Sequence, residues 1–427
     1  MNLIMYLSNW RIISLLTGLG LALLASVVLS SEVIPSEQAF GADHFVDSIG
    51  VAVHLSYVDT PYGKYHEIIQ PRLKELGVRH IRDGLRLEDL ETRQKFNDLA
   101  KLNIKSTLVM DPRDGNTPSH AVSVAKSIPK SIEAIEGPNE WDLLPKLEYK
   151  EKSFPEGTSQ FQAELYSAIK EDPTTAHLPV LSPSIGEPRN IPKQGKVACD
   201  VNNLHHYPYS GEEPTKKFEE IWIRPAMMMC DNQSIIITES GYQAHVDMPY
   251  GISEQTAAKY LLRSFLEYFN REIMRFYSYE LIDTNPATGR YGLLHSDGSR
   301  KPSFIALKNL ISLLQDPIAK TSTSFSLKSL DYKFKGNKSN IHHTLLQKNN
   351  VNFYLILWQE VLSFEHKTKT DLVVPKQPLT LTLNTSISKA VIYQPVNSIT
   401  PLKKYKNVKQ LKLKIPDHPL VIELTPT

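Results

Sequence analysis

Short apolar runs alternate with amphipathic helical segments between residues 46 and 316. The runs, such as 235–237, are continuous rather than alternating, which is typical of strands buried on both faces of a parallel sheet. Apolar residues of the segment 253–270 recur every three or four positions after Ser253, a residue that favours a helix N-terminus. The predicted strands are 46–54, 78–82, 104–110, 132–137, 179–183, 201–207, 234–238 and 273–281, and the predicted helices are 65–76, 87–102, 119–127, 159–170, 217–228, 253–270 and 303–314.

Eight strands with intervening helices predict an α/β fold, a (β/α)8 TIM barrel over 46–316. Its 271 residues (316 − 46 + 1) are near the roughly 250 typical of such a barrel. The connection between residues 184 and 199 lacks a clear helical pattern and is the weakest unit. A doubly wound open sheet is the competing fold, but the first strand is not followed by a glycine-rich phosphate-binding turn.

The pattern changes beyond Pro317 to strands separated by turns, which predicts a smaller all-β sandwich domain over 317–427. Six lysines lie between Pro401 and Ile415 without an intervening acid. Because apolar residues alternate with the last of them, the simplest interpretation is a half-buried strand with a solvated outer face. A face for an anionic glycan or lipid is the alternative. The strands expected here are 353–358, 379–383, 389–393, 410–415 and 420–424.

The segment 12–31 carries no charge and follows Arg11. It is longer than the apolar part of most cleaved signals, which is about 7 to 15 residues, and near the roughly 20 residues that span a bilayer. We therefore expect residues 1–31 to be a signal peptide or an N-terminal membrane anchor, followed by a polar linker over 32–45. The chain would then be exported, as a periplasmic, secreted or anchored protein.

The charge balance narrows the classes of partner. With 427 residues, 48 basic and 46 acidic side chains give a net charge of +2, which argues against a nucleic-acid-binding protein and against membrane contact beyond the N-terminal segment. The two cysteines, Cys199 and Cys230, permit one disulfide in an exported chain. Both fall at the expected bottom of the barrel, so we predict that they pair, with two buried thiols as the alternative.

Two glutamates end predicted strands of the barrel. Glu140 follows the fourth strand in Asn139-Glu140-Trp141, and Glu239 follows the seventh in Thr238-Glu239. The carboxyl ends of barrel strands are where such folds hold their chemistry. Two carboxyl groups on opposite sides of a glycosidic bond can protonate the leaving oxygen and stabilise the oxocarbenium-like centre. Closure of the sheet would bring these two together.

These motifs resemble the retaining glycoside hydrolases of clan A, which are (β/α)8 barrels. Asn139-Glu140 and Glu239 are similar to the clan's catalytic pair, Arg82 to its arginine near the nucleophile, and His205-x-Tyr207 to its motif on the sixth strand. A barrel followed by a β-sandwich looks like families 39, 30 and 79, and family 39 most of all. The resemblance implies Glu140 as acid/base, Glu239 as nucleophile and carboxyls about 5 to 5.5 Å apart. It also implies that Asn139 holds the sugar's 2-hydroxyl.

Further substrate contacts are expected at other strand ends. Trp141 stands where many clan members have proline, and it either stacks on a sugar or packs the loop. Asp111 is a candidate contact, and so is Glu280, with either Tyr279 or Glu280 as the inward residue of strand eight. We predict no metal site, because adjacent histidines of a strand face opposite sides, and no cofactor.

Three functions remain open on the sequence. The first is a retaining glycosidase acting on an extracellular or periplasmic oligosaccharide or polysaccharide. The second is a carbohydrate-binding or surface protein that has kept the barrel without catalysis. The third is a transglycosylase with the same pair of glutamates.

Overall fold

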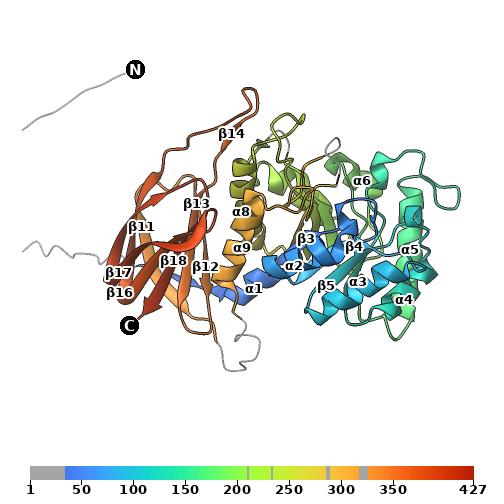
Figure 1. Ribbon diagram of the computed structural model, residues 1–427, viewed down its shortest axis with the longest axis horizontal. Coiled ribbons are helices and arrows are strands. Elements are labelled where there is room, and N and C mark those ends of the chain that lie inside the picture. Colours follow the sequence, from blue (N-terminus) through green and yellow to red (C-terminus); the bar gives the residue numbers. More distant parts are fainter. Residues whose placement is uncertain (1–33, 209–210, 232–233, 285–288, 317–325) are drawn as a thin grey trace, which may run out of the picture. The chain divides into compact units, whose positions relative to one another are not determined.

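Eight parallel strands form the central sheet of the computed structural model (Figure 1), which describes residues 34–208, 211–231, 234–284, 289–316 and 326–427. The strands pair in the order β7-β6-β5-β4-β3-β10-β9-β8, and a parallel bridge between Leu181 and Val201 joins β7 to β8. The barrel is therefore nearly closed, as expected. Its strands are β3 (Ile49–Ala52), β4 (His80–Gly84), β5 (Lys105–Val109), β6 (Ile132–Glu136), β7 (Val180–Leu181), β8 (Asn202–His205), β9 (Ile235–Ser240) and β10 (Arg275–Ser278).

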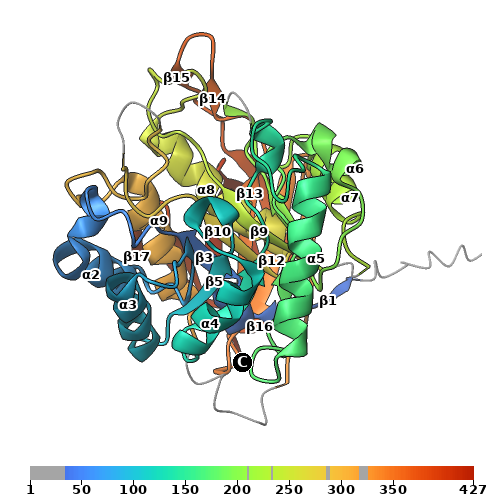
Figure 2. The same cartoon turned by 90° about the vertical axis from the view of Figure 1, so that its right-hand side faces the viewer.

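Helices follow the strands in turn and lie outside the barrel (Figures 1 and 2). All six residues of β9 are buried, which explains the continuous apolar run in the sequence. The hydroxyl of Ser253 accepts a hydrogen bond of 3.0 Å from the Thr256 N–H and caps α8. The helices are α2 (Gln70–Leu76), α3 (Leu90–Lys101), α4 (Pro118–Ser127), α5 (Glu156–Glu171), α6 (Ile191–Gln194), α7 (Arg224–Ala226), α8 (Glu254–Phe269) and α9 (Pro302–Leu314).

Three segments of the barrel differ from the sequence prediction. The first strand starts at Ile49, because the preceding residues form the helix α1 (Ala42–Asp47), which buries Ala42, Phe45 and Val46 at helical spacing. The segment 184–199, in which no clear helix was expected, contains a 3-10 turn (Pro188–Asn190) followed by the four-residue helix α6. The expected helix 217–228 is a π-helical segment (Phe218–Ile223) that runs into α7, which has a proline in its first turn.

The C-terminal residues form an all-β domain. Most of its strands are linked by hydrogen bonds in one sheet, ordered β1-β11-β16-β18-β13-β12-β2 with β17 paired to β16, where two packed sheets were expected, and β14 and β15 pair only with each other. A bulge in β16 merges the two predicted strands 379–383 and 389–393 into one. The strands are β11 (Ser329–Lys335), β12 (Ile341–Gln347), β13 (Phe353–Gln359), β14 (Phe364–Glu365), β15 (Thr370–Asp371), β16 (Gln377–Gln394), β17 (Ser398–Ile415) and β18 (Leu420–Pro426).

The N-terminal strands belong to this C-terminal sheet. β1 (Ser36–Gln38) pairs antiparallel with β11, and β2 (Phe40–Gly41) pairs parallel with β12. The expected linker 32–45 is thus largely structured from residue 36 onward. Residues from Pro35 to Thr427 form one compact unit, and the division at residue 316 stays a prediction.

The barrel and the C-terminal sheet share a core. Ile356 and Trp358 of β13 pack in the same apolar cluster as Leu262 and Phe265 of α8. The neighbouring residues of β13 on the other face, such as Leu355, pack in a separate cluster within the sheet. No described helix is long and apolar enough to cross a membrane, and the predicted signal or anchor, 1–31, lies outside the described residues.

Candidate active site

Glu239 lies near the carboxyl end of β9, where the apolar run gives way to polar residues. Its side chain is largely buried. Arg82, from β4, donates a hydrogen bond to Oε1, and the Tyr207 hydroxyl donates one of 2.8 Å to Oε2. Both oxygens of this carboxylate therefore have a donor, as the sequence resemblance implied for Arg82.

Glu140 follows β6 and has a backbone φ of 52°, in the left-handed region that glutamate rarely adopts. Its N–H donates to the Ser184 carbonyl at 3.0 Å. A Cβ on Gly186 would lie 3.3 Å from the Glu140 carboxyl carbon and 2.6 Å from Leu143 Cδ1, so a larger residue in this neighbouring turn would have to push the Leu143 side chain aside.

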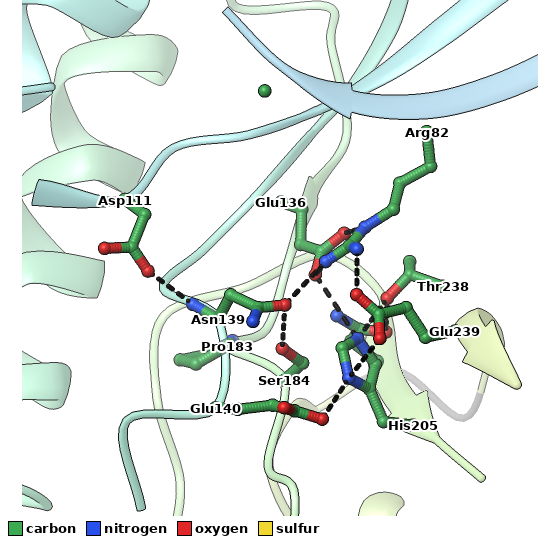
Figure 3. A network of polar contacts seen from close by, with 12 residues as sticks. Arg82, Asp111, Glu136, Asn139, Glu140, Pro183, Ser184, His205, Thr238 and Glu239 are labelled. Carbon is green, nitrogen blue, oxygen red and sulfur yellow. Dashed lines mark hydrogen bonds and ion pairs between the residues drawn. The ribbon is translucent and has the colours of Figure 1, made fainter. Parts of the chain in front are cut away.

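The structure brings the two glutamates together around His205. One carboxylate oxygen of Glu140, one ring nitrogen of His205 and one carboxylate oxygen of Glu239 all lie within 4.8 Å of one another. Both carboxylates approach the same ring nitrogen: His205 Nδ1 lies 2.7 Å from Glu140 Oε1 and 3.6 Å from Glu239 Oε2 (Figure 3). Residues 99 positions apart in the chain thus meet, because β6 and β9 belong to one nearly closed barrel.

Arg82 connects several members of the site (Figure 3). Its guanidinium donates to both oxygens of Glu136, at 2.8 and 2.7 Å, to Glu239, and to the Asn139 side-chain oxygen at 2.7 Å. Burial favours the neutral form of Arg82, but Glu136 and Glu239 outweigh it and raise its pKa. Arg82 is therefore a permanent cation that holds Glu239 and Asn139 in place.

Glu136 was missed by the sequence prediction. It is fully buried at the end of β6. Burial alone would raise its pKa, but the charges and hydrogen bonds of Arg82 and His205 lower the pKa to about 2. Its position in the sequence could have revealed it. A glutamate inside an apolar strand needs a buried cation as partner, and Arg82, at the end of another predicted strand, could supply one.

His205 is fully buried and engaged at both ring nitrogens. Nε2 lies 2.9 Å from the Thr238 hydroxyl, which itself donates to the Asn203 side chain, so Nε2 must carry a hydrogen. Nδ1 lies 2.7 Å from Glu140. Burial opposes the charged imidazole, but Glu239, Glu136 and Glu140 raise the pKa of His205 to about 9.

His206 does not join the site. Its ring lies on the opposite face of the strand, against Phe218 and the Tyr268 hydroxyl, 2.6 Å away. Burial lowers its pKa to about 3, and Arg271 adds to this effect. It is a neutral core histidine.

Two expected substrate contacts instead hold the loop that carries Asn139. Trp141 is buried, and its indole N–H donates to Asp111 at 3.1 Å. Asp111 also accepts from the Asn139 N–H at 2.9 Å and from Arg113. Of the two alternatives for Trp141, the structure shows loop packing, and the Asp111 carboxylate is occupied by this loop.

Glu280 lies beside the site and not on its surface. It is buried, and its Oε2 lies 3.6 Å from His54 Nε2. Burial, with the charges of Asp283 and Glu239, raises its pKa to about 8. Tyr279, the other candidate on this strand, lines the cavity.

A cavity of about 360 Å³ opens next to the two glutamates. His54 and Tyr57, which the sequence prediction missed, stack at 4.7 Å with rings nearly parallel. Aromatic and hydrogen-bonding side chains along one hollow are typical of a small-molecule or sugar site. The lining residues include His54, Tyr57, Arg82, Asp83, Arg86, Asp111, Arg113, Asp114, Asn139, Glu140, Glu239 and Tyr279.

The three clustered residues, two glutamates and a histidine, do not suit a metal ion. Glu140, His205 and Glu239 are close enough to be considered. His205, however, has both nitrogens engaged and a pKa of about 9, whereas a metal needs the neutral imidazole. The Arg82 cation already occupies one oxygen of Glu239.

The two cysteines form a disulfide, Cys199–Cys230, with Cα atoms 5.5 Å apart. Cys199 precedes β8 and Cys230 precedes β9, so the bridge lies at the amino ends of two adjacent strands. The opposite ends of these strands carry His205 and Glu239.

No protein-family model matches the chain, and no curated protein matches it. Among solved structures, a β-glucuronidase of Parabacteroides merdae aligns with a TM-score of 0.46 and 9% identity, over 88% of this chain and 58% of its own. A GH2 β-galacturonidase from Eisenbergiella tayi gives 0.44 and 15%, over 66% and 54%. A β-1,3-glucanosyltransferase of Rhizomucor miehei gives 0.41 and 12%, over 62% and 97%.

These similarities are remote. The chain spans 58% of the length of the first of these proteins. The expected membership of family 39 finds no support among them. The function is therefore argued from the geometry of the site.

Proposed function

We propose that this protein is a retaining glycoside hydrolase that cleaves an O-glycosidic bond of an extracellular or periplasmic glycan. The carrying observation is that one carboxylate oxygen of Glu140 and one of Glu239 lie within 4.8 Å of each other, both beside His205 Nδ1. Retaining enzymes hold their two carboxyls about 5 to 5.5 Å apart, whereas inverting ones leave about 6.5 to 9.5 Å for a water molecule. The close spacing favours retention.

Glu239 would be the nucleophile. Its carboxylate accepts from Arg82 and Tyr207, which fix its orientation. Attack on the anomeric carbon forms a bond to one carboxylate oxygen and releases the leaving oxygen. Asn139, held by Arg82 and Ser184 through its side-chain oxygen, keeps its amide N–H groups for a sugar hydroxyl.

Glu140 would be the acid/base, and His205 would donate the proton that Glu140 needs. The Nε2–H of His205 is committed to Thr238, so the 2.7 Å contact between Nδ1 and Glu140 shares a single proton. In the free protein the proton rests on the imidazole, because His205 has the raised pKa and Glu140 a lowered one. Transfer over this short distance makes Glu140 a neutral acid when a leaving oxygen arrives.

The second half of the reaction uses the same pair in reverse. Glu140, ionised after protonating the leaving group, would take a proton from water as the water oxygen bonds to the anomeric carbon and the bond to Glu239 breaks, which releases Glu239 as a carboxylate. His205 can then receive that proton again. Export, inferred from the segment 12–31, would place this chemistry outside the cytoplasm.

Azide rescue of a nucleophile variant tests the proposal. Glu239→Ala should lose at least about 1,000-fold in kcat on aryl β-glycosides, and azide should restore turnover with a glycosyl azide of inverted configuration. Glu171→Ala, which removes an exposed glutamate at the end of α5, is the matched control and should keep full activity.

The outcomes separate the other functions. Undiminished turnover in Glu239→Ala would refute the proposal. Products longer than the substrate would indicate a transglycosylase. Glycan binding that survives loss of both glutamates, with no turnover in the parent protein, would indicate a binding protein.

A further inference from the structure

The cavity beside the two glutamates extends along one side of the barrel mouth. Its lining comes mainly from the loops after β3, β4 and β5, in the ranges 53–57, 82–86 and 109–114. Asn139, whose amide N–H groups are left for a sugar hydroxyl, also lines it. On the proposed function, the sugar that Glu239 attacks therefore occupies this cavity, and the leaving group lies outside it.

A row of aromatic rings leads away from Glu239. Tyr207, which donates a hydrogen bond to Glu239, lies 6.5 Å from Tyr279 between ring centroids. Tyr279 lies 5.6 Å from His54, and His54 lies 4.7 Å from Tyr57. The last three of these rings line the cavity. Tyr57 therefore ends the row, at the far side of the cavity from Glu239.

The end of the cavity at Tyr57 is open to solvent. Tyr57 is 49% exposed. Arg86 and Asp114, which form an ion pair of 3.5 Å, have 59% and 42% of their side chains exposed. Arg82 and Glu239, at the reacting centre, are buried. A cavity for a single terminal sugar would close with buried groups beyond that sugar, so the open end leaves room for the glycan to continue.

Tyr57 has the properties of a platform for a sugar ring. One of its faces stacks on His54 with 7° between the ring planes, which fixes its orientation, while about half of the residue stays exposed. Burial lowers the pKa of His54 to about 4, so the imidazole is uncharged at neutral pH. Aromatic rings bury a large apolar area in a fixed geometry, and the C–H face of a pyranose ring matches it. Arg86 and Asp114 supply donors and acceptors for its hydroxyl groups.

We propose that the cavity binds two consecutive sugar units of the glycan, the second of them stacked on Tyr57. We call the open end of the cavity, formed by Tyr57, Arg86 and Asp114, the second subsite. The substrate is then an oligosaccharide or polysaccharide with at least two sugars on the side of the bond that Glu239 attacks. Such an enzyme releases disaccharides or longer products instead of single terminal sugars. The proposal rests on the proposed function, which places the first sugar at Asn139.

Binding of glycans of graded length tests the second subsite without relying on turnover. Every protein carries Glu140→Gln, which removes the acid, and is titrated with single sugars and β-linked oligosaccharides of glucose, xylose, mannose, galactose or N-acetylglucosamine. At least one series should bind about 10-fold more tightly when a second sugar is added, and Tyr57→Ala should remove this gain. Tyr57→Phe, which keeps the ring, should retain it. Equal melting temperatures verify that each variant is folded.

An exposed tyrosine outside the cavity lining provides the matched control. Tyr250, in the loop after β9, is 58% exposed. Tyr250→Ala should retain the gain in affinity from the second sugar. An equal loss in Tyr250→Ala and Tyr57→Ala would overturn the assignment of the second sugar to Tyr57.

Turnover provides the second measurement, in proteins that keep Glu140. The 4-nitrophenyl glycosides of the single sugar and of the disaccharide from the bound series are compared. In the parent, kcat/KM should be about 10-fold higher for the disaccharide, and in Tyr57→Ala this ratio should fall toward unity through a higher KM. A ratio that Tyr57→Ala leaves unchanged would overturn the second subsite.

Failure of the second subsite and failure of the proposed function give different results. Affinity that does not rise with a second sugar, or absence of binding to every series, would overturn the second subsite even if azide rescues Glu239→Ala. Binding that depends on glycan length and on Tyr57, in a parent protein without turnover, would support the second subsite and refute hydrolysis.

Discussion

Arg82 shows how a single residue sets the electrostatics of the site. Its guanidinium lies among Glu136, Glu239 and Asn139, all of which accept hydrogen bonds from it. Two buried carboxylates share this one cation, and His205 supplies a second positive charge nearby. An isolated buried carboxylate would take up a proton. The two cations keep Glu136 ionised.

The pH dependence of turnover should follow His205. Its pKa is raised to about 9, so the proton it shares with Glu140 is present below that pH and lost above it. We expect kcat/KM to fall as pH rises through about 9. In His205→Gln the fall should begin at lower pH, and kcat should drop about 100-fold for substrates whose leaving group needs a proton.

The choice of leaving group provides the control for this prediction. Aryl glycosides with acidic phenols leave without protonation, so His205→Gln should impair them much less than alkyl glycosides. An unchanged alkaline limb in His205→Gln, or equal loss on both substrate classes, would assign His205 a purely structural role.

The residues of the candidate site could be predicted at the residue scale because they lie at strand ends. Arg82, Asn139, Glu140 and Glu239 each end a recognisable apolar run, and closure of the barrel brings them together. Contacts between the loops that follow different strands could not be predicted. Asp111 is occupied by Trp141 and the Asn139 N–H, which depends on how one loop folds over another.

At the element scale, continuous runs of apolar residues predicted the barrel strands. The elements that were predicted wrongly or missed are explained by the residues they contain. Ala42, Phe45 and Val46 have helical spacing, so α1 replaces the start of the first strand. Prolines in the first turn of α6 and of α7 accompany helices of four and three residues. β1 has three residues and β2 has two, and neither contains an apolar run. They are strands only because they form hydrogen bonds with β11 and β12, which the sequence pattern does not show.

The segment between β13 and β16 reaches the loop that follows Glu239. Phe364, on β14, is buried with Tyr242 and Ile252 from that loop and Tyr260 from α8. Asp371, on β15, accepts hydrogen bonds from Ser253 and Thr256 at the start of α8, including one of 2.7 Å from Thr256. The C-terminal domain thus supports one wall of the barrel mouth.

Removing the Phe364 ring should loosen this wall. Phe364→Ala leaves a cavity among Tyr242, Ile252 and Tyr260, and we expect the free energy of unfolding to fall by about 3 to 5 kcal/mol. Hydrogen exchange in 241–253 should accelerate. The control Val373→Ala, at a residue that is 96% exposed, should change stability by less than about 0.5 kcal/mol. Equal stability of the two variants would contradict the prediction.

At the scale of the whole molecule, polar and apolar contacts both join the barrel to the C-terminal sheet. Arg263 of α8 is fully buried, and it donates to Glu360 at 2.6 Å and to the Val361 carbonyl at 2.8 Å. Ile356 and Trp358 pack in the barrel's own core cluster. A buried contact of this kind is costly to open, so the two regions should lose structure together.

We expect a single calorimetric transition for residues 35–427 within the full chain, and a characteristic response to breaking the buried pair. Arg263→Met and Glu360→Leu should each lower the free energy of unfolding by about 3 to 5 kcal/mol, because the remaining charge loses its partner. The double variant should recover part of that loss. Arg300→Met, which breaks a surface pair with Glu75, should cost less than about 1 kcal/mol. Two separate transitions in the parent would contradict this cooperativity.

The pairing of β1 with β11 has a consequence for biosynthesis. Glu37 and Tyr332, 295 residues apart in the chain, are hydrogen-bonded across this pair. At roughly 5 to 20 residues per second, a ribosome delivers the partner some 15 to 60 seconds after the first strand emerges. The newborn chain therefore cannot complete this edge of the sheet until late in translation, so β1 must wait without its partner while the whole barrel is being synthesised.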